Sequence, residues 1–325
     1  MKDIGALLNI IENIKHAQKI AICGHIKTDA DSLGSTSALY YALLKMNKIV
    51  DIFCDDIPSF NYNFIGTSEI LNKNQKNKYD LFIVIDTATA DRLGIYTKLI
   101  YKSAVIINID HHSGNAKFGN INYIDSDVSS AGEIIFELIK LLGVEIDAKI
   151  ATAIYAAISG DTGCFTFDNT KPETYYVAGD LLKLGANMKI VNFYLFKRNT
   201  KNRLKLISKM YNSFMYFEND KIIIIPVFFK DLEETGCSVY DTHTIVSHGL
   251  SIDSAEISVM ITEEKPNKYT VSLRSKDKAD SNKIAMHFGG GGHAKAAGFN
   301  ISGDYNTIFN QILTECKNEL EFIKF

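Results

Sequence analysis

The sequence has no excess of positive charge, because its 35 Lys and Arg residues are balanced by 38 Asp and Glu residues, for a net charge of −3. Affinity for a long nucleic acid depends on many contacts between basic side chains and phosphates. The charge balance therefore argues against a long duplex as ligand. A short phosphorylated ligand needs only a few local cations, so that class stays compatible with the composition.

Long apolar runs and paired cysteines are also missing. No segment approaches the ~20 apolar residues that a membrane-spanning helix requires, so we expect no membrane partner. Residues 1–15 place Ile4, Leu7, Leu8 and Ile11 at the spacing of an amphipathic helix, which is not the pattern of a signal peptide. The five cysteines are odd in number, scattered and form no C-x-x-C pair. A disulfide framework and a zinc ribbon are therefore disfavoured, and a reducing compartment, the cytoplasm, is expected.

The first half of the chain alternates short apolar runs with helical patterns. The whole chain is 46% apolar, which excludes disorder for most of it, and its 325 residues suit two domains. Ile- and Val-rich runs at 19–23, 79–86 and 104–110 each end at a polar residue. Near-continuous apolar strands separated by helices predict an α/β fold with a parallel sheet covered by helices on both faces. The predicted helices are 32–45, 129–142, 147–158 and 171–184.

The pattern changes in the second half. Residues 193–217 form a basic stretch with helical spacing and few helix breakers, which we interpret as a bridge between domains. Further strands are predicted after it, followed by a glycine run and a terminal helix. We therefore expect a catalytic domain at 1–185, a helical linker at 186–218 and a smaller α/β domain at 219–325. The predicted elements of this second domain are strands 221–228, 255–261 and 269–274 and helix 305–320.

Residues of metal-binding types gather where the predicted elements of the first domain end. One group lies in the turn after the first strand, single residues or pairs end the next two strands, and one Asp ends a helix. The carboxyl ends of parallel strands meet at one edge of a sheet, where open α/β folds bind ligands. The set at this edge is His25, Asp29, Asp31, Asp86, Asp110, His111, His112 and Asp161.

Each of these residues alone has an ordinary structural explanation, because an Asp after a strand is most often a helix cap or a turn residue. Together they are too many polar groups to satisfy at one edge without a metal ion. Mixed imidazole and carboxylate ligation suits Mn²⁺, with other divalent transition metals less favoured and a pure Mg²⁺ site disfavoured. A carboxylate shared by two ions would set them ~3.5–4 Å apart, a spacing that serves in-line phosphoryl displacement.

With these motifs in order, the sequence resembles the DHH phosphoesterase superfamily. It is most similar to the DHH–DHHA1 subgroup of small bacterial oligoribonuclease and phosphoadenosine-phosphatase enzymes, and the resemblance covers nearly the whole chain. The first-domain motifs that carry it are Gly24-His25-Ile26-Lys27-Thr28-Asp29-Ala30-Asp31, Asp86, Asp110-His111-His112 and Ser159-Gly160-Asp161. The second-domain motifs are Gly289-Gly290-Gly291-Gly292-His293 and Ala296-Ala297-Gly298-Phe299.

The resemblance implies roles for the first-domain residues. One metal ion would be held by His25, Asp29 and Asp86. The other would be held by Asp31, Asp86, His111 and Asp161, with Asp86 bridging the two ions. His112 would contact the scissile phosphate, and Asp110 would orient the two neighbouring histidines. No protein nucleophile is implied, because water attacks the phosphorus in such two-metal sites.

The resemblance also implies a phosphate-binding role for the second domain, with the active site in the cleft between the domains. Four consecutive glycines, Gly289, Gly290, Gly291 and Gly292, allow backbone N–H groups to approach an anion closely. Arg274 ends the strand before this run and His293 follows it. All of them would bind the terminal phosphate of the substrate, for which the donor fork of arginine is well suited. His243 and His248 are expected on a helix of this domain.

Two departures from the family pattern are visible. Thr28, Ala30 and Ser32 stand in the first motif where relatives commonly have Pro, Gly and Ala, which is expected to alter the stiffness of the loop and none of the ligands. Thr166 lies in a region where many relatives carry an Arg, so one substrate contact differs. The Ser-Arg-Lys-Lys-Gln motif of family II pyrophosphatases is absent, which demotes that activity. A RecJ-like processive exonuclease would need further domains and a basic channel.

The sequence therefore predicts a Mn²⁺-dependent phosphodiesterase with two metal ions. It would release 5′-mononucleotides from short 5′-phosphorylated oligoribonucleotides and linear dinucleotides such as pApA, and 3′-phosphoadenosine 5′-phosphate is a further candidate substrate. Two alternatives stay open: a cyclic di-AMP phosphodiesterase with the same metals, and a non-enzymatic module that senses nucleotides. The resemblance is compatible with a homodimer.

Overall fold

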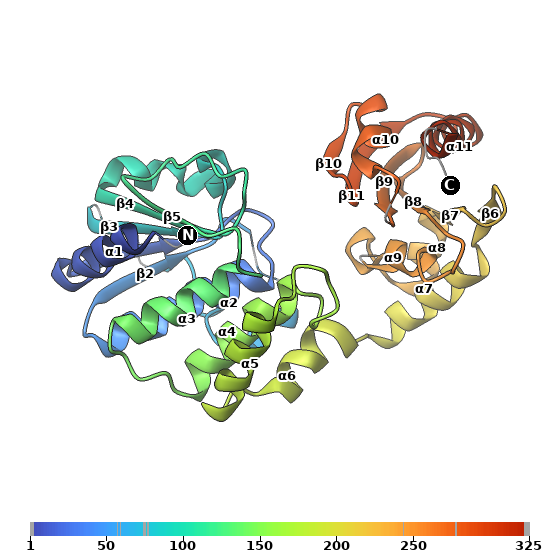
Figure 1. The fold of residues 1–325 in the computed structure, drawn as a ribbon. Helices are drawn as coiled ribbons and strands as arrows, with labels where there is room; N and C mark the ends of the chain where they lie inside the picture. Colours follow the sequence, from blue (N-terminus) through green and yellow to red (C-terminus); the bar gives the residue numbers. More distant parts are fainter. Residues whose placement is uncertain are drawn as a thin grey trace. The chain divides into compact units, whose positions relative to one another are not determined.

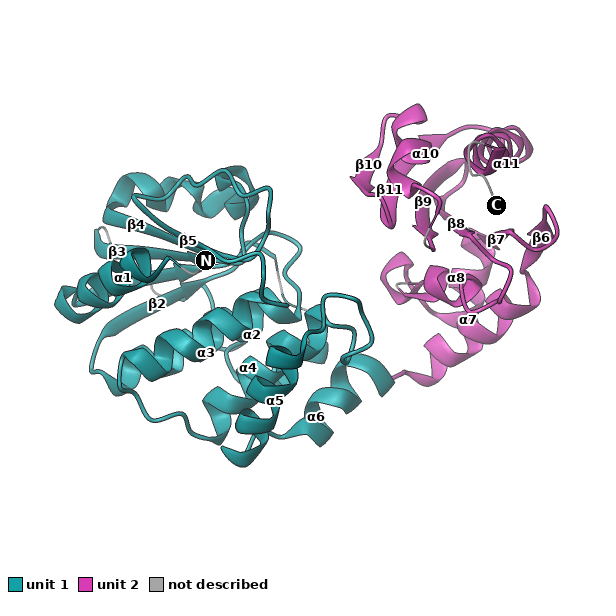
Figure 2. Ribbon diagram, in the orientation of Figure 1, with its two compact units in different colours: residues 1–198 teal, residues 199–325 magenta. Residues whose placement is uncertain are grey.

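The computed structural model divides the chain into two compact units, residues 1–198 and 199–325, which Figure 2 colours separately. It describes residues 3–321 apart from 57, 59, 74, 75, 77, 243 and 277. His243 therefore lies outside the described residues. No helix within the described ranges is both long and apolar enough to cross a membrane.

The first unit is built on a five-stranded sheet in which every strand is parallel to its neighbours, as expected (Figure 1). The strand order is β2-β1-β3-β4-β5. Two of the strands, β2 and β5, were not predicted, because both are short and carry polar residues such as Asp51 and Asn122. The five strands are β1 Lys19–Cys23, β2 Ile49–Phe53, β3 Tyr79–Ile85, β4 Ser103–Asp110 and β5 Ile121–Ile124.

Both faces of this sheet are covered, as the apolar strands predicted. On β1, Ile20 and Ile22 point into the larger core with the α-helices, whereas Ala21 and Cys23 point into a smaller core. A 3₁₀ helix, η2 (Ala90–Lys102), supplies Leu93, Tyr96 and Leu99 to that smaller core. The other elements of this unit are α1 Ile4–His16, α2 Ala30–Lys45, η1 Phe60–Ile65, α3 Ala131–Leu141, α4 Ala148–Asp161, α5 Pro172–Lys183, α6 Met188–Asn192 and η3 Phe193–Lys197.

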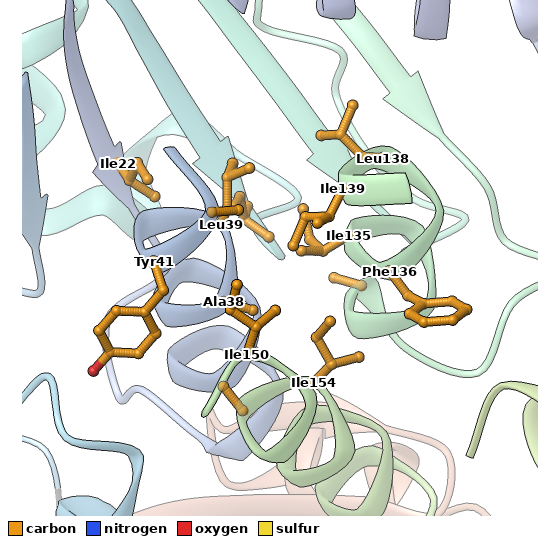
Figure 3. Close-up of a cluster of buried hydrophobic side chains, with 14 of the residues drawn as sticks. Ile22, Ala38, Leu39, Tyr41, Ile135, Phe136, Leu138, Ile139, Ile150 and Ile154 are labelled. Carbon is orange, nitrogen blue, oxygen red and sulfur yellow. The ribbon is translucent and has the colours of Figure 1, made fainter. Parts of the chain in front are cut away.

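Helix α2 lies between the sheet and α4 in the larger core (Figure 3). Ile22 of β1 and Leu39 of α2 are fully buried there, and Ile150 and Ile154 of α4 pack behind them. The two helices approach each other closely at Gly34. A Cβ atom at Gly34 would lie 2.5 Å from the carbonyl oxygen of Ala153. This close packing sets the position of α4, at whose end Asp161 lies.

We expect Gly34→Ala to destabilise the first unit by about 1–3 kcal/mol, because the added methyl group meets backbone and cannot be accommodated by a side-chain rotation. Gly179→Ala in α5 is the matched control, since nothing lies within 4 Å of a Cβ atom there. That variant should gain up to about 1 kcal/mol from the lower entropy of the unfolded chain. Urea unfolding of both variants measures the difference. Equal stability of the two variants would contradict the close packing of α2 on α4.

The stretch 193–217, expected to be helical, is helical only in part. After α6 the chain forms one π-helical turn, η3, and Arg198 is then extended with φ −68° and ψ 121°. Thr200 begins a new helix, α7 (Lys201–Asn212), by accepting a hydrogen bond from the backbone N–H of Arg203 at 3.0 Å. The last residues of the predicted helix form strand β6 (Met215–Phe217) instead, because they pair with an apolar strand. The units therefore divide inside the segment expected to be helical.

The second unit contains a six-stranded sheet in the order β10-β11-β9-β8-β7-β6. Neighbouring strands are antiparallel except for β7 and β8, which are parallel. One face packs on α10 and α11, and the other packs on α7, α8 and α9. The elements after β6 are β7 Ile222–Val227, α8 Phe229–Thr235, η4 Val239–Thr242, α9 Ile245–Gly249, β8 Ile257–Lys265, β9 Lys268–Ser275, α10 Ser281–His287, β10 Gly291–His293, β11 Ala296–Ser302 and α11 Tyr305–Glu321.

Candidate metal centre

The first-unit candidate residues gather at the carboxyl edge of the parallel sheet. The chain connections leave β1 and β3 in opposite directions along the sheet, to β2 and β4, so the edge between these two strands is a topological switch point. The loop after β1 carries His25 and Asp29, and Asp86 follows β3 directly. Asp110 ends β4, the next strand. The fold therefore brings separate sequence motifs to one place.

His25, Asp29 and Asp86 form one group of possible ligands. The Nε2 atom of His25 lies 3.5 Å from Asp29 Oδ2 and 3.3 Å from Asp86 Oδ2. The other ring nitrogen, Nδ1, lies 2.7 Å from the carbonyl oxygen of Ile26. A carbonyl can only accept, so a proton on Nδ1 would satisfy this contact, and Nε2 is the nitrogen that faces the carboxylates. The Nη2 atom of Arg92, a residue that belongs to none of the motifs above, lies 3.2 Å from Nδ1.

His111 is the centre of a second group. Its Nε2 atom lies 3.7 Å from Asp31 Oδ2, 3.4 Å from Asp86 Oδ1 and 3.6 Å from Asp161 Oδ2. Asp86 therefore directs one carboxylate oxygen toward each of the two histidines, Oδ2 toward His25 and Oδ1 toward His111. Only Asp86 belongs to both sets of contacts, as the expected bridging position requires.

The carboxylate of Asp31 is held by the first turn of α3. Its oxygens accept backbone N–H groups from Ala131 at 2.8 Å and Gly132 at 3.0 Å, and the hydroxyl of Ser35 at 2.9 Å. Helix N-termini stabilise negative charge, which offsets part of the cost of burying this side chain at 1% exposure. The buried Glu133 in turn accepts from Ser129 and Thr174. This network fixes the helix turn that holds Asp31.

We expect Glu133→Ala to weaken Mn²⁺ affinity about tenfold to a hundredfold, the usual effect of losing the support of a ligand. Glu133→Gln retains an acceptor oxygen and should restore most of the affinity. Glu137→Ala is the matched control, because Glu137 lies one turn later in α3, has a 42% exposed side chain and pairs with Lys140 at 3.2 Å. Calorimetric titration of the metal-free variants with Mn²⁺ measures the effect. An equal loss in the Glu137 control would contradict the positioning role of Glu133.

Asp110 holds the two adjacent histidines in place. Its Oδ1 atom accepts the backbone N–H of His111 at 2.8 Å and the Nδ1–H of His112 at 2.7 Å. The side chain of Asn115 donates to Oδ2 at 2.5 Å. Asp110 is fully buried, whereas the side chain of His112 is 39% exposed. Asn115 lies three residues after His112, in a short turn. The only hint of its role in the sequence is that a polar residue closely follows the histidine pair.

The group as a whole carries more negative charge than its surroundings stabilise. Burial and the neighbouring carboxylates of Asp86 and Asp161 raise the pKa of Asp31 well above its usual range. Burial also raises the pKa of Asp161 to about 6. For His25 and His111 burial works against the charged form, but the carboxylates that face each imidazole outweigh it and raise the pKa of each to about 10. In the absence of metal ions these raised pKa values favour protonated side chains, and bound cations would stabilise the deprotonated carboxylates instead.

The donor set fits divalent metal ions. Asp86 Oδ1 is a buried oxygen that accepts no hydrogen bond in the structure, and such an atom is costly unless another partner, such as a cation, satisfies it. Within each possible ligand group, one nitrogen or oxygen per residue lies within 4.8 Å of the others. Imidazole with carboxylate is a common ligand set for divalent transition metals. The groups are His25–Asp29–Asp86, Asp31–His111–Asp161 and Asp86–Asp110–His111–His112.

In the second unit, Arg274 and His293 lie in one row of the sheet. Arg274 on β9 and His293 on β10 both pair with Ala296 of the strand between them, which places their backbones about 10 Å apart with side chains on the same face. Burial lowers the pKa of Arg274 from its usual value. Among the described residues no carboxylate forms an ion pair with Arg274 at 4.0 Å or less.

At two positions of the glycine run, strand pairing by itself explains why the residue is glycine. Gly291 and Gly292 are part of β10 and not of a loop. A Cβ atom at Gly290 would lie 2.4 Å from the carbonyl oxygen of Gly298, and one at Gly292 would lie 2.5 Å from that of Ala296. These two glycines are therefore required for the pairing with β11. Gly289 and Gly291 are open, with nothing closer than 3.7 Å to a Cβ atom at either position.

Comparison with known proteins identifies both halves of the chain. Residues 19–158 match the DHH family, N-terminal domain, and residues 219–319 match the DHHA1 domain. A probable bifunctional oligoribonuclease and PAP phosphatase NrnA from Streptococcus mutans is 30% identical, over 97% of this chain and 99% of the relative. The bifunctional oligoribonuclease and PAP phosphatase NrnA from Thermus thermophilus is 28% identical, over 93% of this chain and 90% of the relative.

A solved structure supports the fold. The crystal structure of an exopolyphosphatase-related protein from Bacteroides fragilis superimposes with a TM-score of 0.91, covering 98% of this chain and 97% of the other. The two sequences are 23% identical.

Proposed function

Because the chain belongs to the DHH family, as a phosphoesterase with a DHH and a DHHA1 domain, we propose that it hydrolyses short oligoribonucleotides and linear dinucleotides such as pApA to 5′-mononucleotides. The observation that carries the proposal is the position of Asp86, whose two oxygens face two separate histidine–carboxylate groups. A centre of this kind suits phosphoryl transfer to water. The named activities of the relatives support the substrate class.

In this proposal His25, Asp29 and Asp86 hold one divalent ion. The second is held by Asp31, Asp86, His111 and Asp161. Two such ions supply Lewis-acid stabilisation of charge on the attacking and leaving oxygens of an in-line displacement. Imidazole ligands make Mn²⁺ the preferred ion, with other divalent transition metals as substitutes.

His112 is the residue that would contact the scissile phosphate. Its Nδ1 atom is bonded to Asp110 at 2.7 Å, so the imidazole has a fixed orientation and its Nε2 atom is left for another partner. The hydrogen bond to Asp110 and the charge of that carboxylate raise the pKa of His112, with burial opposing them. A protonated imidazole can donate a hydrogen bond to a phosphate oxygen and offset its charge.

The second unit would bind the terminal phosphate of the substrate through Arg274, His293 and the glycine run Gly289–Gly292. Arg274 Nη1 donates to the carbonyl oxygen of Leu273 at 2.9 Å. Because no described carboxylate pairs with it, the guanidinium could form a bidentate contact with a phosphate. Recognition of one phosphorylated end selects short substrates and needs no basic surface. It agrees with the net charge of −3.

Three further points belong to the same proposal. Because the relatives are named as PAP phosphatases, 3′-phosphoadenosine 5′-phosphate is a second candidate substrate. Cyclic di-AMP is the alternative phosphodiester substrate. A nucleotide-sensing module without catalysis would not need the complete ligand set. The enzyme is proposed to act in the cytoplasm. One chain contains all the residues proposed for the reaction, and a homodimer is compatible with it.

Initial rates on three substrates in Mn²⁺ buffer, each with a chelator control, test the proposal. We expect release of AMP from pApA to be much faster than opening of cyclic di-AMP, with 3′-phosphoadenosine 5′-phosphate also hydrolysed. Faster opening of the cyclic dinucleotide would assign the protein to its turnover instead, with pApA as the intermediate. Absence of metal-dependent hydrolysis of all three would reject the proposed reaction and favour the sensing module.

A further inference from the structure

A cavity of about 170 Å³ lies beside the metal centre in the first unit. One side of it is polar, where Asp29 begins α2 and Asp161 ends α4. Three further lining residues, Tyr62, Leu195 and Phe196, come from two elements that the metal centre does not use, η1 and η3. The lining residues are Asp29, Ala30, Tyr62, Gly160, Asp161, Leu195 and Phe196.

The apolar wall is an irregular backbone element held in place by aromatic packing. Leu195 and Phe196 lie on the π-helical turn η3, a rare conformation that is frequent at functional sites. The neighbouring Tyr194 anchors this turn, since its ring lies 5.5 Å from that of Phe64 in η1. Arg198 lies over Tyr194 at 5.6 Å and donates to Asn61 at 2.7 Å. These contacts fix η3 against η1 without using Phe196.

Phe196 itself is left 43% exposed. This exposed ring lines the same cavity as Asp29 and Asp161 and is not part of the core clusters of the unit. A ligand that fills this cavity must combine a charged group, held at the metal centre, with a flat apolar group that lies against Phe196 and Tyr62. A nucleotide has this combination, because its phosphate and its base are separated by a ribose.

We propose that this cavity binds one nucleobase of the substrate, stacked against Phe196 and Tyr62. The inference rests on the proposed function, because it names where that substrate places a base. The volume is far larger than the ~30 Å³ that one water occupies. It is smaller than the ~300–1,000 Å³ of sites that enclose a drug-sized ligand, so it suits a single base and not a whole dinucleotide.

Stacking also agrees with the expected substrate range. Every base has a π-face, so an aromatic wall accepts different bases with little sequence preference. An enzyme that degrades short RNA of mixed sequence requires this property. The cavity would thereby contribute affinity at the scissile end of the substrate, independently of the terminal phosphate.

Binding of AMP and of ribose 5-phosphate to the full chain, in Mn²⁺ buffer, tests the proposal without depending on turnover. The base should make AMP bind about tenfold to a hundredfold more tightly than the base-free sugar phosphate. Phe196→Ala should remove most of this difference, and Phe196→Trp should retain it. Phe193→Ala is the matched control, because Phe193 lies on the same turn, is 49% exposed and does not line the cavity.

Hydrolysis supplies the second readout. Phe196→Ala should raise KM for pApA about tenfold or more, with little change for dinucleotide analogues that lack the base bound in the cavity. Two analogues of pApA, each lacking one of the two bases, identify which base binds in the cavity. An AMP preference that survives in Phe196→Ala, or that is lost equally in the Phe193 control, would overturn the base site. If pApA is not hydrolysed at all, the proposed reaction fails, and the binding comparison still decides whether the cavity takes a base.

Discussion

Asp86→Asn is expected to lower the rate of pApA hydrolysis by at least about a thousandfold. A carboxylate that serves two cations contributes several kcal/mol to stabilising the charge of the transition state, and each 1.36 kcal/mol changes the rate tenfold. The two oxygens of Asp86 lie 3.3 Å from His25 Nε2 and 3.4 Å from His111 Nε2. The amide of Asn has one oxygen and no charge, so in this variant one group loses its ligand oxygen and both lose the negative charge. Bound Mn²⁺ per chain should fall together with the rate.

The substitution is chosen so that the fold survives. Asp86 has φ 57°, a left-handed conformation that Asn adopts as readily as Asp. Asp51→Asn is the control, because Asp51 is another buried carboxylate of the same sheet, 8% exposed, and binds the hydroxyl of Tyr79 instead of a histidine. Rate and metal content are measured for both variants. Unchanged hydrolysis in Asp86→Asn would reject the two-ion assignment.

Arg274→Ala is expected to weaken the affinity for pApA about tenfold to a hundredfold while the metal content stays constant. A hydrogen bond to a charged group contributes about 1.5–3 kcal/mol, and a bidentate arginine is the strongest form of it. Dinucleotides without the 5′-phosphate should bind the variant and the unaltered protein equally. This comparison separates recognition of the phosphate from recognition of the rest of the substrate.

Lys268→Ala serves as the control for Arg274, because Lys268 is an exposed cation at the other end of the same strand, β9. Inhibition constants of pApA and ApA, with bound Mn²⁺ measured on the same samples, give the result. Loss of bound Mn²⁺ with unchanged affinity for pApA would show that Arg274 supports the metal centre instead. The proposed division of labour between the two units would then be wrong.

The sequence predicted the parts of the centre that depend on strand ends. Asp86 and Asp110 each follow or end an Ile- and Val-rich run, and the carboxyl ends of parallel strands must meet at one edge. The structure brings all eight first-unit candidates to that edge, in groups that share Asp86 and His111. The individual roles of these residues stay predictions that the variants above test.

Features that depend on packing between distant segments were not predicted. The backbone N–H groups of Ala131 and Gly132 donate to Asp31. Ala131 and Asp31 are 100 residues apart in the chain, and no sequence pattern indicates such a contact. Arg92 lies beside His25 for the same reason. The stretch 193–217 is helical only in part, because helical spacing does not reveal the cap at Thr200 or the pairing partner of β6.

Titration of metal-free protein with Mn²⁺, with bound metal and the initial rate of AMP release from pApA followed together, tests the two-ion centre most directly. Hydrolysis should be absent in the stripped protein, and the rate should rise with occupancy until two ions are bound per chain. Hydrolysis that persists after chelation, or full occupancy by two ions without hydrolysis, would contradict the two-ion phosphodiesterase.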